Sequence, residues 1–162
     1  MKEDRDAISL AAELFQQAYE CQMQGKLEYA IELYKRSIEI YPTAEAHTFL
    51  GWSYSFQGKL DEAIEECKKA IEIDADFGNP YNDIGAYLIE KEKYDEAIPW
   101  LEKATAAKRY ESYHYPHYNL GRAYMAKGMM KRALEEFKKA LEIAPDYPLA
   151  ADAAENLKRL IN

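Results

Sequence analysis

The sequence contains no valine and only three threonines, against 24 alanines. β-Sheets are enriched in β-branched residues, whereas alanine is the best helix former. The composition therefore predicts an all-α protein. With only two cysteines, Cys21 and Cys67, the chain has no disulfide framework, and we expect it to reside in a reducing compartment, the cytoplasm.

Long apolar runs are missing as well. The longest stretch without Asp, Glu, Lys or Arg covers residues 46–58, whereas a membrane-spanning helix needs about 20 apolar residues. We therefore expect no membrane segment, and the charged residues 1–6 predict no secretory signal. Basic residues are a minority, with 21 Lys and Arg against 29 Asp and Glu. This balance disfavours nucleic acid and anionic lipid as partners, because both need clustered positive charge.

What the sequence does contain is an internal repeat. Three glycines, Gly51, Gly85 and Gly121, are spaced 34 and 36 residues apart. Four alanines recur at nearly the same interval: Ala30, Ala63, Ala97 and Ala133. A period near 34 residues with helical patterning predicts stacked helix pairs.

The repeat resembles the tetratricopeptide repeat (TPR), whose pattern is W-x2-L-G-x2-Y, then A-x3-F, then P. The fourth repeat matches this pattern at six positions: Leu120, Gly121, Tyr124, Ala133, Phe137 and Pro145. His117 stands at the Trp position. The second and third repeats carry the same register from His47 and Tyr81, and the first, from Leu14, is the most degraded. The resemblance covers nearly the whole chain.

This resemblance implies a right-handed α-solenoid of four helix-turn-helix units plus a C-terminal capping helix. We place the four repeats as follows: 11–43, 44–77, 78–113 and 114–147. Residues 1–10 are expected to form a tail that leads into the first helix, with residues 1–6 frayed. Residues 148–162 are expected to form the capping helix, with its apolar face made by four residues: Leu149, Ala153, Leu157 and Leu160.

Glycines mark two further features of the repeats. Three of them stand where the first helix of a pair ends and are expected to adopt the left-handed conformation: Gly25, Gly58 and Gly128. The third repeat has Glu92 at this position, so we expect a strained turn there. Gly85 and Gly121 are expected where paired helices touch, because a larger side chain would overpack the contact.

The sequence shows no catalytic constellation, so we expect no enzyme and no cofactor. A nucleophile elbow, a P-loop and a dinucleotide-binding glycine pattern are all missing. His114 and His117 form an H-x2-H pair, but a metal site needs about four ligands. His117, like His47, also occupies the aromatic packing position of the repeat. We therefore interpret these imidazoles as packing residues with an exposed polar tip, and expect no metal site.

In the TPR architecture, the first helix of each pair lines the concave surface, so its non-packing residues are candidate ligand contacts. Aromatic side chains dominate the N-terminal half of this surface: Phe15, Tyr19, Phe49, Trp52 and Phe56. The C-terminal half carries amides, tyrosines and two charges: Asn82, Asp83, Tyr115, Tyr118, Asn119 and Arg122. Exposed aromatic clusters mark interaction sites, and amides both donate to and accept from a peptide backbone. Two alternatives stay open: some aromatics contact a neighbouring segment instead, and Asp83 pairs with Arg122.

We therefore expect a monomeric scaffold that binds a peptide or protein segment in this groove. A clamp for the acidic tails of heat-shock chaperones is not expected, because Phe15 and Tyr19 stand where such clamps carry Lys and Asn. Two other interpretations stay open: a homodimer docked through the aromatic face, and a chaperone dedicated to one client protein. A third, an enzyme or metal protein, has no residue constellation to support it. Residues 1–77 carry 8 basic and 16 acidic residues, whereas residues 78–162 are neutral. The resulting negative electrostatic potential would steer a partner with a basic flank towards the first half of the chain.

Overall fold

The computed structural model describes all 162 residues and contains nine α-helices. Four helices form a compact first unit, Met1–Ala75: α1 (Lys2–Met23), α2 (Leu27–Ile40), α3 (Ala44–Phe56) and α4 (Leu60–Ile73). Five helices form a second unit, Asp76–Asn162: α5 (Asn79–Glu90), α6 (Tyr94–Ala106), α7 (His114–Ala126), α8 (Met130–Ile143) and α9 (Pro148–Ile161). The predicted all-α class is confirmed. No helix is both long enough and apolar enough to cross a membrane.

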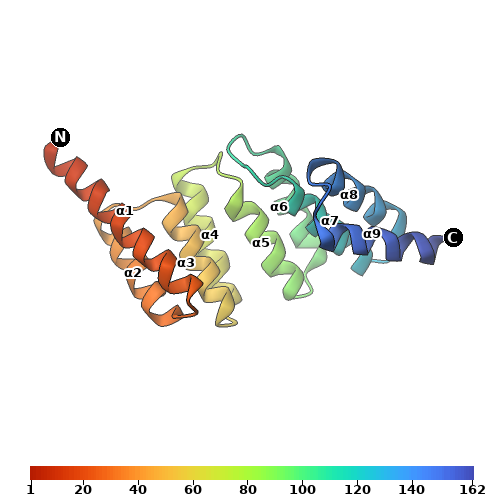
Figure 1. The fold of residues 1–162 in the computed structure, drawn as a ribbon, viewed down its shortest axis with the longest axis horizontal. Helices are drawn as coiled ribbons and strands as arrows, with labels where there is room; N and C mark the ends of the chain where they lie inside the picture. Colours follow the sequence, from red (N-terminus) through yellow and green to blue (C-terminus); the bar gives the residue numbers. More distant parts are fainter. The chain divides into compact units, whose positions relative to one another are not determined.

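Successive helices pack as antiparallel pairs, α1 with α2 and α3 with α4 in the first unit, and α5 with α6 and α7 with α8 in the second (Figure 1). The second helix of each pair buries a stripe with the period of a helix turn. In α8 this stripe consists of Ala133, Phe137 and Ala140, all fully buried. Opposite it, a Cβ added to Gly121 would lie 2.4 Å from Cε1 of Phe137. The glycine is therefore what lets α7 approach α8, as the repeat pattern predicts.

The first helix is longer than the sequence analysis predicts. We expected residues 1–6 to be frayed and residues 1–10 to form a tail, but α1 begins at Lys2. Acidic Glu3 and Asp4 lie in its first turn, where they interact favourably with the positive end of the helix dipole. Asp4 also lies 3.1 Å from the amino group of Met1. The expectation of a frayed end is therefore wrong, and the first turns of α1 extend as an exposed helix (Figure 1).

The turns inside the helix pairs have the backbone conformation that the glycines predict. Gly25, Gly58 and Gly128 have φ angles of 76°, 76° and 77°. Glu92 occupies the equivalent turn of the third pair with φ of 60°, and it is the one non-glycine residue of the chain with a positive φ. A side chain in this conformation clashes with its own backbone, so the strain expected at Glu92 is confirmed.

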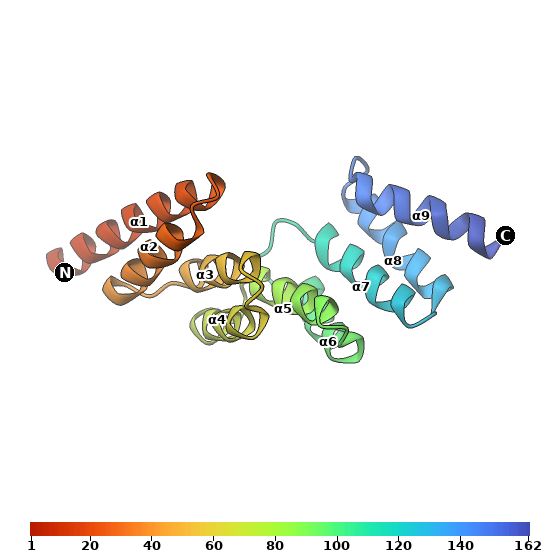
Figure 2. The same cartoon turned by 90° about the horizontal axis from the view of Figure 1, so that it is seen from below.

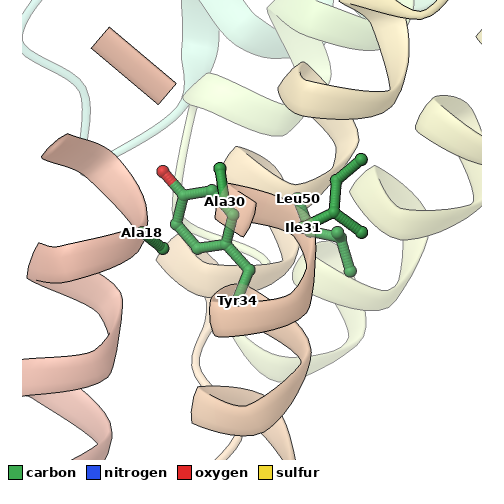
Figure 3. Close-up of a cluster of buried hydrophobic side chains, with 5 residues drawn as sticks. All are labelled: Ala18, Ala30, Ile31, Tyr34 and Leu50. Carbon is green, nitrogen blue, oxygen red and sulfur yellow. The ribbon is translucent and has the colours of Figure 1, made fainter. Parts of the chain in front are cut away.

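The core of the first unit forms around Tyr34 of α2. Its ring is fully buried and lies between Ala18 of α1 and Leu50 of α3 (Figure 3). Its hydroxyl donates a 2.7 Å hydrogen bond to Oε1 of Gln22. Burial, together with the nearby Tyr19 and Cys21, raises the pKa of Tyr34 above its ordinary value. Tyr34 therefore stays neutral and fixes α1, α2 and α3 against one another.

In the second unit, the segment between α6 and α7 folds back onto the chain that precedes α5 (Figure 1). The backbone N–H of Arg109 donates to the carbonyl of Asp76, and that of Gly78 donates to the carbonyl of Arg109, both at 2.9 Å. The ring of Tyr110 fills the space beside Gly78, where an added Cβ would lie 1.9 Å from its Cδ2. This loop lies in the repeat with the longer, 36-residue spacing. The sequence analysis did not predict that it packs against the segment before α5.

The last helix packs against α8 (Figure 2), and its buried face matches the predicted one only in part. The buried residues of α9 are Ala150, Ala154 and Leu157. Leu149 and Leu160, which we expected in this face, are 53% and 76% exposed. Leu157 was predicted correctly and is 1% exposed. The rest of the contact with α8 uses Ala150 and Ala154, whose small side chains allow closer approach of two helices.

Candidate functional site

Five aromatic residues form a continuous cluster on the first unit, which we call the aromatic face: Phe15, Tyr19, Phe49, Trp52 and Phe56. Phe15 and Tyr19 are four residues apart on α1, and the other three follow at helical spacing on α3. Because α1 and α3 contact each other, the two stripes meet.

Phe49 is the centre of the aromatic face. Its ring centroid lies 5.3 Å from that of Phe15, 5.8 Å from that of Tyr19 and 5.8 Å from that of Trp52, all in edge-to-face geometry. Trp52 in turn lies 5.2 Å from Phe56. Such pairs contribute about 0.5–1.5 kcal/mol each beyond the area that they bury. The aromatic face is therefore a preformed surface.

The aromatic face is anchored at its inner end and open at its outer end. Phe15 and Phe49 are half-buried and pack against the core cluster around Tyr34. Tyr19 and Phe56 are 36% and 58% exposed. The alternative that aromatics contact a neighbouring segment thus describes part of the cluster, because the inner rings serve the core while the outer rings meet solvent.

A second group of predicted residues lies together on α5 and α7 of the second unit, and we call it the polar cluster: Asn82, Asp83, Asn119 and Arg122. Asn119 donates from Nδ2 to Oδ1 of Asn82 at 2.9 Å, and Arg122 donates from Nη1 to Oδ1 of Asn119 at 3.0 Å. Both asparagines are more than nine-tenths buried. The amides that we expected to face a ligand therefore also link two helices of the protein.

Asp83 and Arg122, an alternative ion pair in the sequence analysis, take different partners. Arg122 bonds to Asn119, whereas the hydrogen bond to the Asp83 carboxyl comes from Asn82. Burial raises the pKa of Asp83 to about 7, and the bond from Asn82 offsets this only in part. Asp83 thus gains a proton near neutral pH because burial disfavours its charged form.

Tyr115 and Tyr118, also predicted, lie against a residue that the sequence analysis missed. Tyr147, between α8 and α9, packs edge-on against both rings, with centroid distances of 5.6 Å and 5.3 Å. Burial and the neighbouring tyrosines raise the pKa of Tyr147 to about 12, although Arg122 acts in the opposite direction. Tyr147 precedes a helix in a linker, so no periodic pattern identifies it. Tyr110 was missed for the same reason.

The histidines at the aromatic position of the repeat each form a hydrogen bond with a glutamate of the paired helix. Nδ1 of His47 lies 2.7 Å from Oε2 of Glu66, and Nδ1 of His117 lies 2.8 Å from Oε2 of Glu136. Our interpretation of an exposed polar tip is therefore wrong, because Nδ1 of each ring is bound to a glutamate inside its helix pair. In the third pair, the equivalent positions carry Tyr81 and Trp100, whose rings stack 6.1 Å apart.

These His–Glu hydrogen bonds do not assemble a metal site. No group of three or more His, Cys, Asp or Glu side chains has the arrangement to hold a metal ion. Lys69 and Lys139 bind the second oxygen of Glu66 and Glu136, at 2.9 Å and 3.2 Å. Burial alone would raise the pKa of both glutamates, but the bonds from histidine and lysine outweigh it and hold the pKa below its usual range. The arrangement stabilises the helix pair.

Helix pairs with close-approach glycines and a period near 34 residues define a class of repeat protein, and family models identify which one. Models described as tetratricopeptide repeat match residues 44–77, 79–110 and 115–147, together more than half of the chain. The chain therefore belongs to the tetratricopeptide repeat family, and the predicted all-α solenoid of TPR units is confirmed. No curated protein sequence matches the chain.

Solved structures of TPR proteins are similar to this one. PilF of Pseudomonas aeruginosa is 25% identical with a TM-score of 0.88, over 94% of this chain and 69% of PilF. MamA is 25% identical with a TM-score of 0.73, over 88% of this chain and 82% of MamA. The first TPR domain of Spaghetti (RPAP3), bound to an HSP90 peptide, is 23% identical with a TM-score of 0.68, over 74% of this chain and 93% of that domain.

Proposed function

We propose that this protein is an interaction module that binds a peptide or an extended protein segment, with the aromatic face as its principal contact. The observation that carries the proposal is the cluster from Phe15 to Phe56, which is fixed by the core yet exposes Tyr19 and Phe56. Rigid aromatic rings with one exposed side are the usual anchors of protein interfaces. The family supports the same function, since the similar RPAP3 domain holds a peptide.

The polar cluster is proposed as a second contact of the same kind. Asn119 has one Nδ2 hydrogen engaged with Asn82, and Tyr115 is 42% exposed beside it on α7. Amides of this kind bind a peptide backbone whatever its side chains. Tyr118 and Arg122 would flank the bound segment, with the Arg122 guanidinium available to a carboxylate.

The proposed ligand is not the acidic chaperone tail of a carboxylate clamp. Such a clamp needs lysine, arginine and asparagine on adjacent inner helices, and the residues here are Phe15 and Tyr19 on α1 and Phe49 on α3. The aromatic rings cannot neutralise a carboxylate.

We also propose that the protein is not an enzyme and that it acts as a monomer. We propose that it works in the cytoplasm, where its free Cys21 and Cys67 would stay reduced.

The test is to select binders from a displayed random-peptide library and to measure their affinity for defined variants. Trp52→Ala should weaken binding at least about tenfold, because aromatic anchors contribute about 2 kcal/mol or more. Tyr29→Ala is the matched control, since Tyr29 lies on α2, is 70% exposed and takes no part in the aromatic face. Peptides that bind wild type and Trp52→Ala equally would place the contact elsewhere. Sedimentation of the free protein separates a monomer from the alternative homodimer.

A further inference from the structure

The helices that carry the aromatic face have an unusual charge distribution. α3 contains Glu45 and no lysine or arginine, and α1 has none between Asp6 and its end at Met23. Over that stretch α1 carries three carboxylates: Asp6, Glu13 and Glu20. The basic residues of the first unit lie instead on α2, on α4, in the turns and at the start of α1. Apart from Lys2 and Arg5 at the start of α1, the two helices that carry the aromatic face therefore contribute only negatively charged side chains.

The rings of the aromatic face form no cation–π contact with the protein's own lysines and arginines. Lysine or arginine lies over other aromatic rings at several places, with Lys35 and Lys59 about 6.0 Å and 5.9 Å from the ring of Tyr54, and Lys103 4.8 Å from that of Trp100. No lysine or arginine lies over any ring of the aromatic face. The exposed rings of the aromatic face, Tyr19 and Phe56, thus present an electron-rich surface over which no cation of the chain lies.

From these two observations we infer that the aromatic face recognises a segment of another protein in which arginine or lysine alternates with apolar side chains. The apolar side chains would pack on Phe56, and the cations would lie over the rings of Tyr19 and Trp52. An aromatic ring attracts a cation through its negative face, and nearby carboxylates such as Glu20 add to the attraction. The inference rests on the proposed function, because it names the chemistry of the ligand for the same face.

Charge also decides against other occupants. A second copy of this chain would bring another net-negative unit, with 15 acidic and 8 basic residues, against the carboxylates of α1 and α3. Like charges brought together at an interface disfavour the complex. An acidic peptide would meet the same repulsion, whereas a basic segment would be attracted from a distance.

The probe is a set of three fluorescent peptides of equal length. The first alternates leucine with arginine, the second replaces arginine with citrulline, which has nearly the same shape and no charge, and the third replaces arginine with glutamate. We expect the arginine peptide to bind wild-type protein about tenfold more tightly than the citrulline peptide, measured by fluorescence anisotropy. One exposed cation–π contact changes affinity about two- to fivefold, so two contacts give this ratio. The glutamate peptide should bind most weakly.

Substitutions test whether the preference arises from the rings. Trp52→Leu and Tyr19→Leu keep an apolar side chain but remove the ring, and should reduce the arginine-to-citrulline ratio towards one. Glu20→Gln should weaken only the arginine peptide, by about twofold. Tyr29→Leu, outside the face, should leave all three affinities unchanged.

The outcomes separate this inference from the proposed function. If arginine and citrulline peptides bind equally well and both lose affinity in Trp52→Leu, the face binds apolar segments and the cation preference is wrong. If the arginine peptide keeps its preference in Trp52→Leu and Tyr19→Leu, the preference comes from overall charge and the inference is also wrong. If no face substitution changes any affinity, or no peptide binds, the inference and the peptide-binding role of this face both fail.

Discussion

Asn119 donates a 2.9 Å hydrogen bond to Asn82, and this contact joins the first helices of two successive repeats in the second unit. Both side chains are 7–8% exposed, so the bond lies in an environment where a lost partner is costly. Arg122 extends the chain of bonds through its contact with Asn119. The residues proposed to read a peptide backbone therefore also hold the helices that present them.

This linkage predicts coupling between the two amides. Asn119→Ala and Asn82→Ala should each lower the free energy of unfolding by about 1–3 kcal/mol, because each leaves a buried polar group without its partner. The double variant should cost about 1 kcal/mol less than the sum, as measured by urea denaturation. Asn156→Ala on the exposed face of α9 is the control and should be neutral. Purely additive costs would contradict the coupling.

The turn at Glu92 predicts a stabilising substitution. Glu92→Gly should raise the free energy of unfolding by about 0.5–1 kcal/mol, because it removes a left-handed non-glycine residue at φ of 60°. The melting temperature should rise by a few degrees, measured by circular dichroism. Glu96→Gly, a few residues along in α6, should instead destabilise by about 1 kcal/mol. Equal effects of the two changes would show that Glu92 is unstrained.

The contact between Gly121 and Phe137 predicts a strong effect of added volume. Gly121→Leu should destabilise by about 1–3 kcal/mol or more, since even a Cβ would lie 2.4 Å from the Phe137 ring. Phe137→Leu should partly rescue Gly121→Ala, because the obstacle is a side chain. Gly51→Ala offers the contrast: its Cβ would lie 2.9 Å from the backbone oxygen of Ala63, which no substitution can trim. A Gly121→Leu variant as stable as wild type would refute the close approach.

Asp83 predicts a loss of stability as pH rises. Its pKa is about 7 in the folded protein and near 3.8 when unfolded, so the folded state holds the proton more tightly and is favoured most at low pH. Stability should fall between about pH 4 and pH 8, by about 2 kcal/mol for this half-buried group. Asp83→Asn should remove this slope and be the more stable protein at about pH 8. A slope that persists in the variant would assign it to another group.

Glu66 and Glu136 predict the opposite dependence at lower pH. Their pKa lies below the ordinary value of 4.5, so the folded state favours the charged carboxylate and its stability contribution is lost as pH falls through that pKa. Glu66→Gln should cost about 1–2 kcal/mol at neutral pH and less at about pH 3, where Glu66 is more often protonated. Glu65→Gln is the matched control, because Glu65 is two-thirds exposed and its pairing with Lys68 is a surface contact. Equal costs at both pH values would contradict the assignment.

Much of the candidate site follows from helical periodicity. The stripes Phe15–Tyr19 and Phe49–Trp52–Phe56 could be predicted because each lies on one helix with a spacing of three or four residues. The TPR pattern also predicts which helices are adjacent. The same reasoning grouped Asn82 with Asn119. It gave no information on Tyr147 and Tyr110, which lie in linkers without periodicity, or on the His47–Glu66 pair, where the repeat pattern implied an aromatic packing residue.

The sequence by itself determined the helix class, the period and the turns, because these depend on residues within one or two helices and recur four times. It determined the strain at Glu92 for the same reason, since a single backbone position requires glycine. Only the tertiary structure decided how Asn119 and Asp83 are used. Their partners and their burial depend on which side chains from other helices come within reach, and a residue 37 positions away, such as Asn82 from Asn119, has no local signal. The charge state of Asp83 near neutral pH is therefore a property of the folded unit alone.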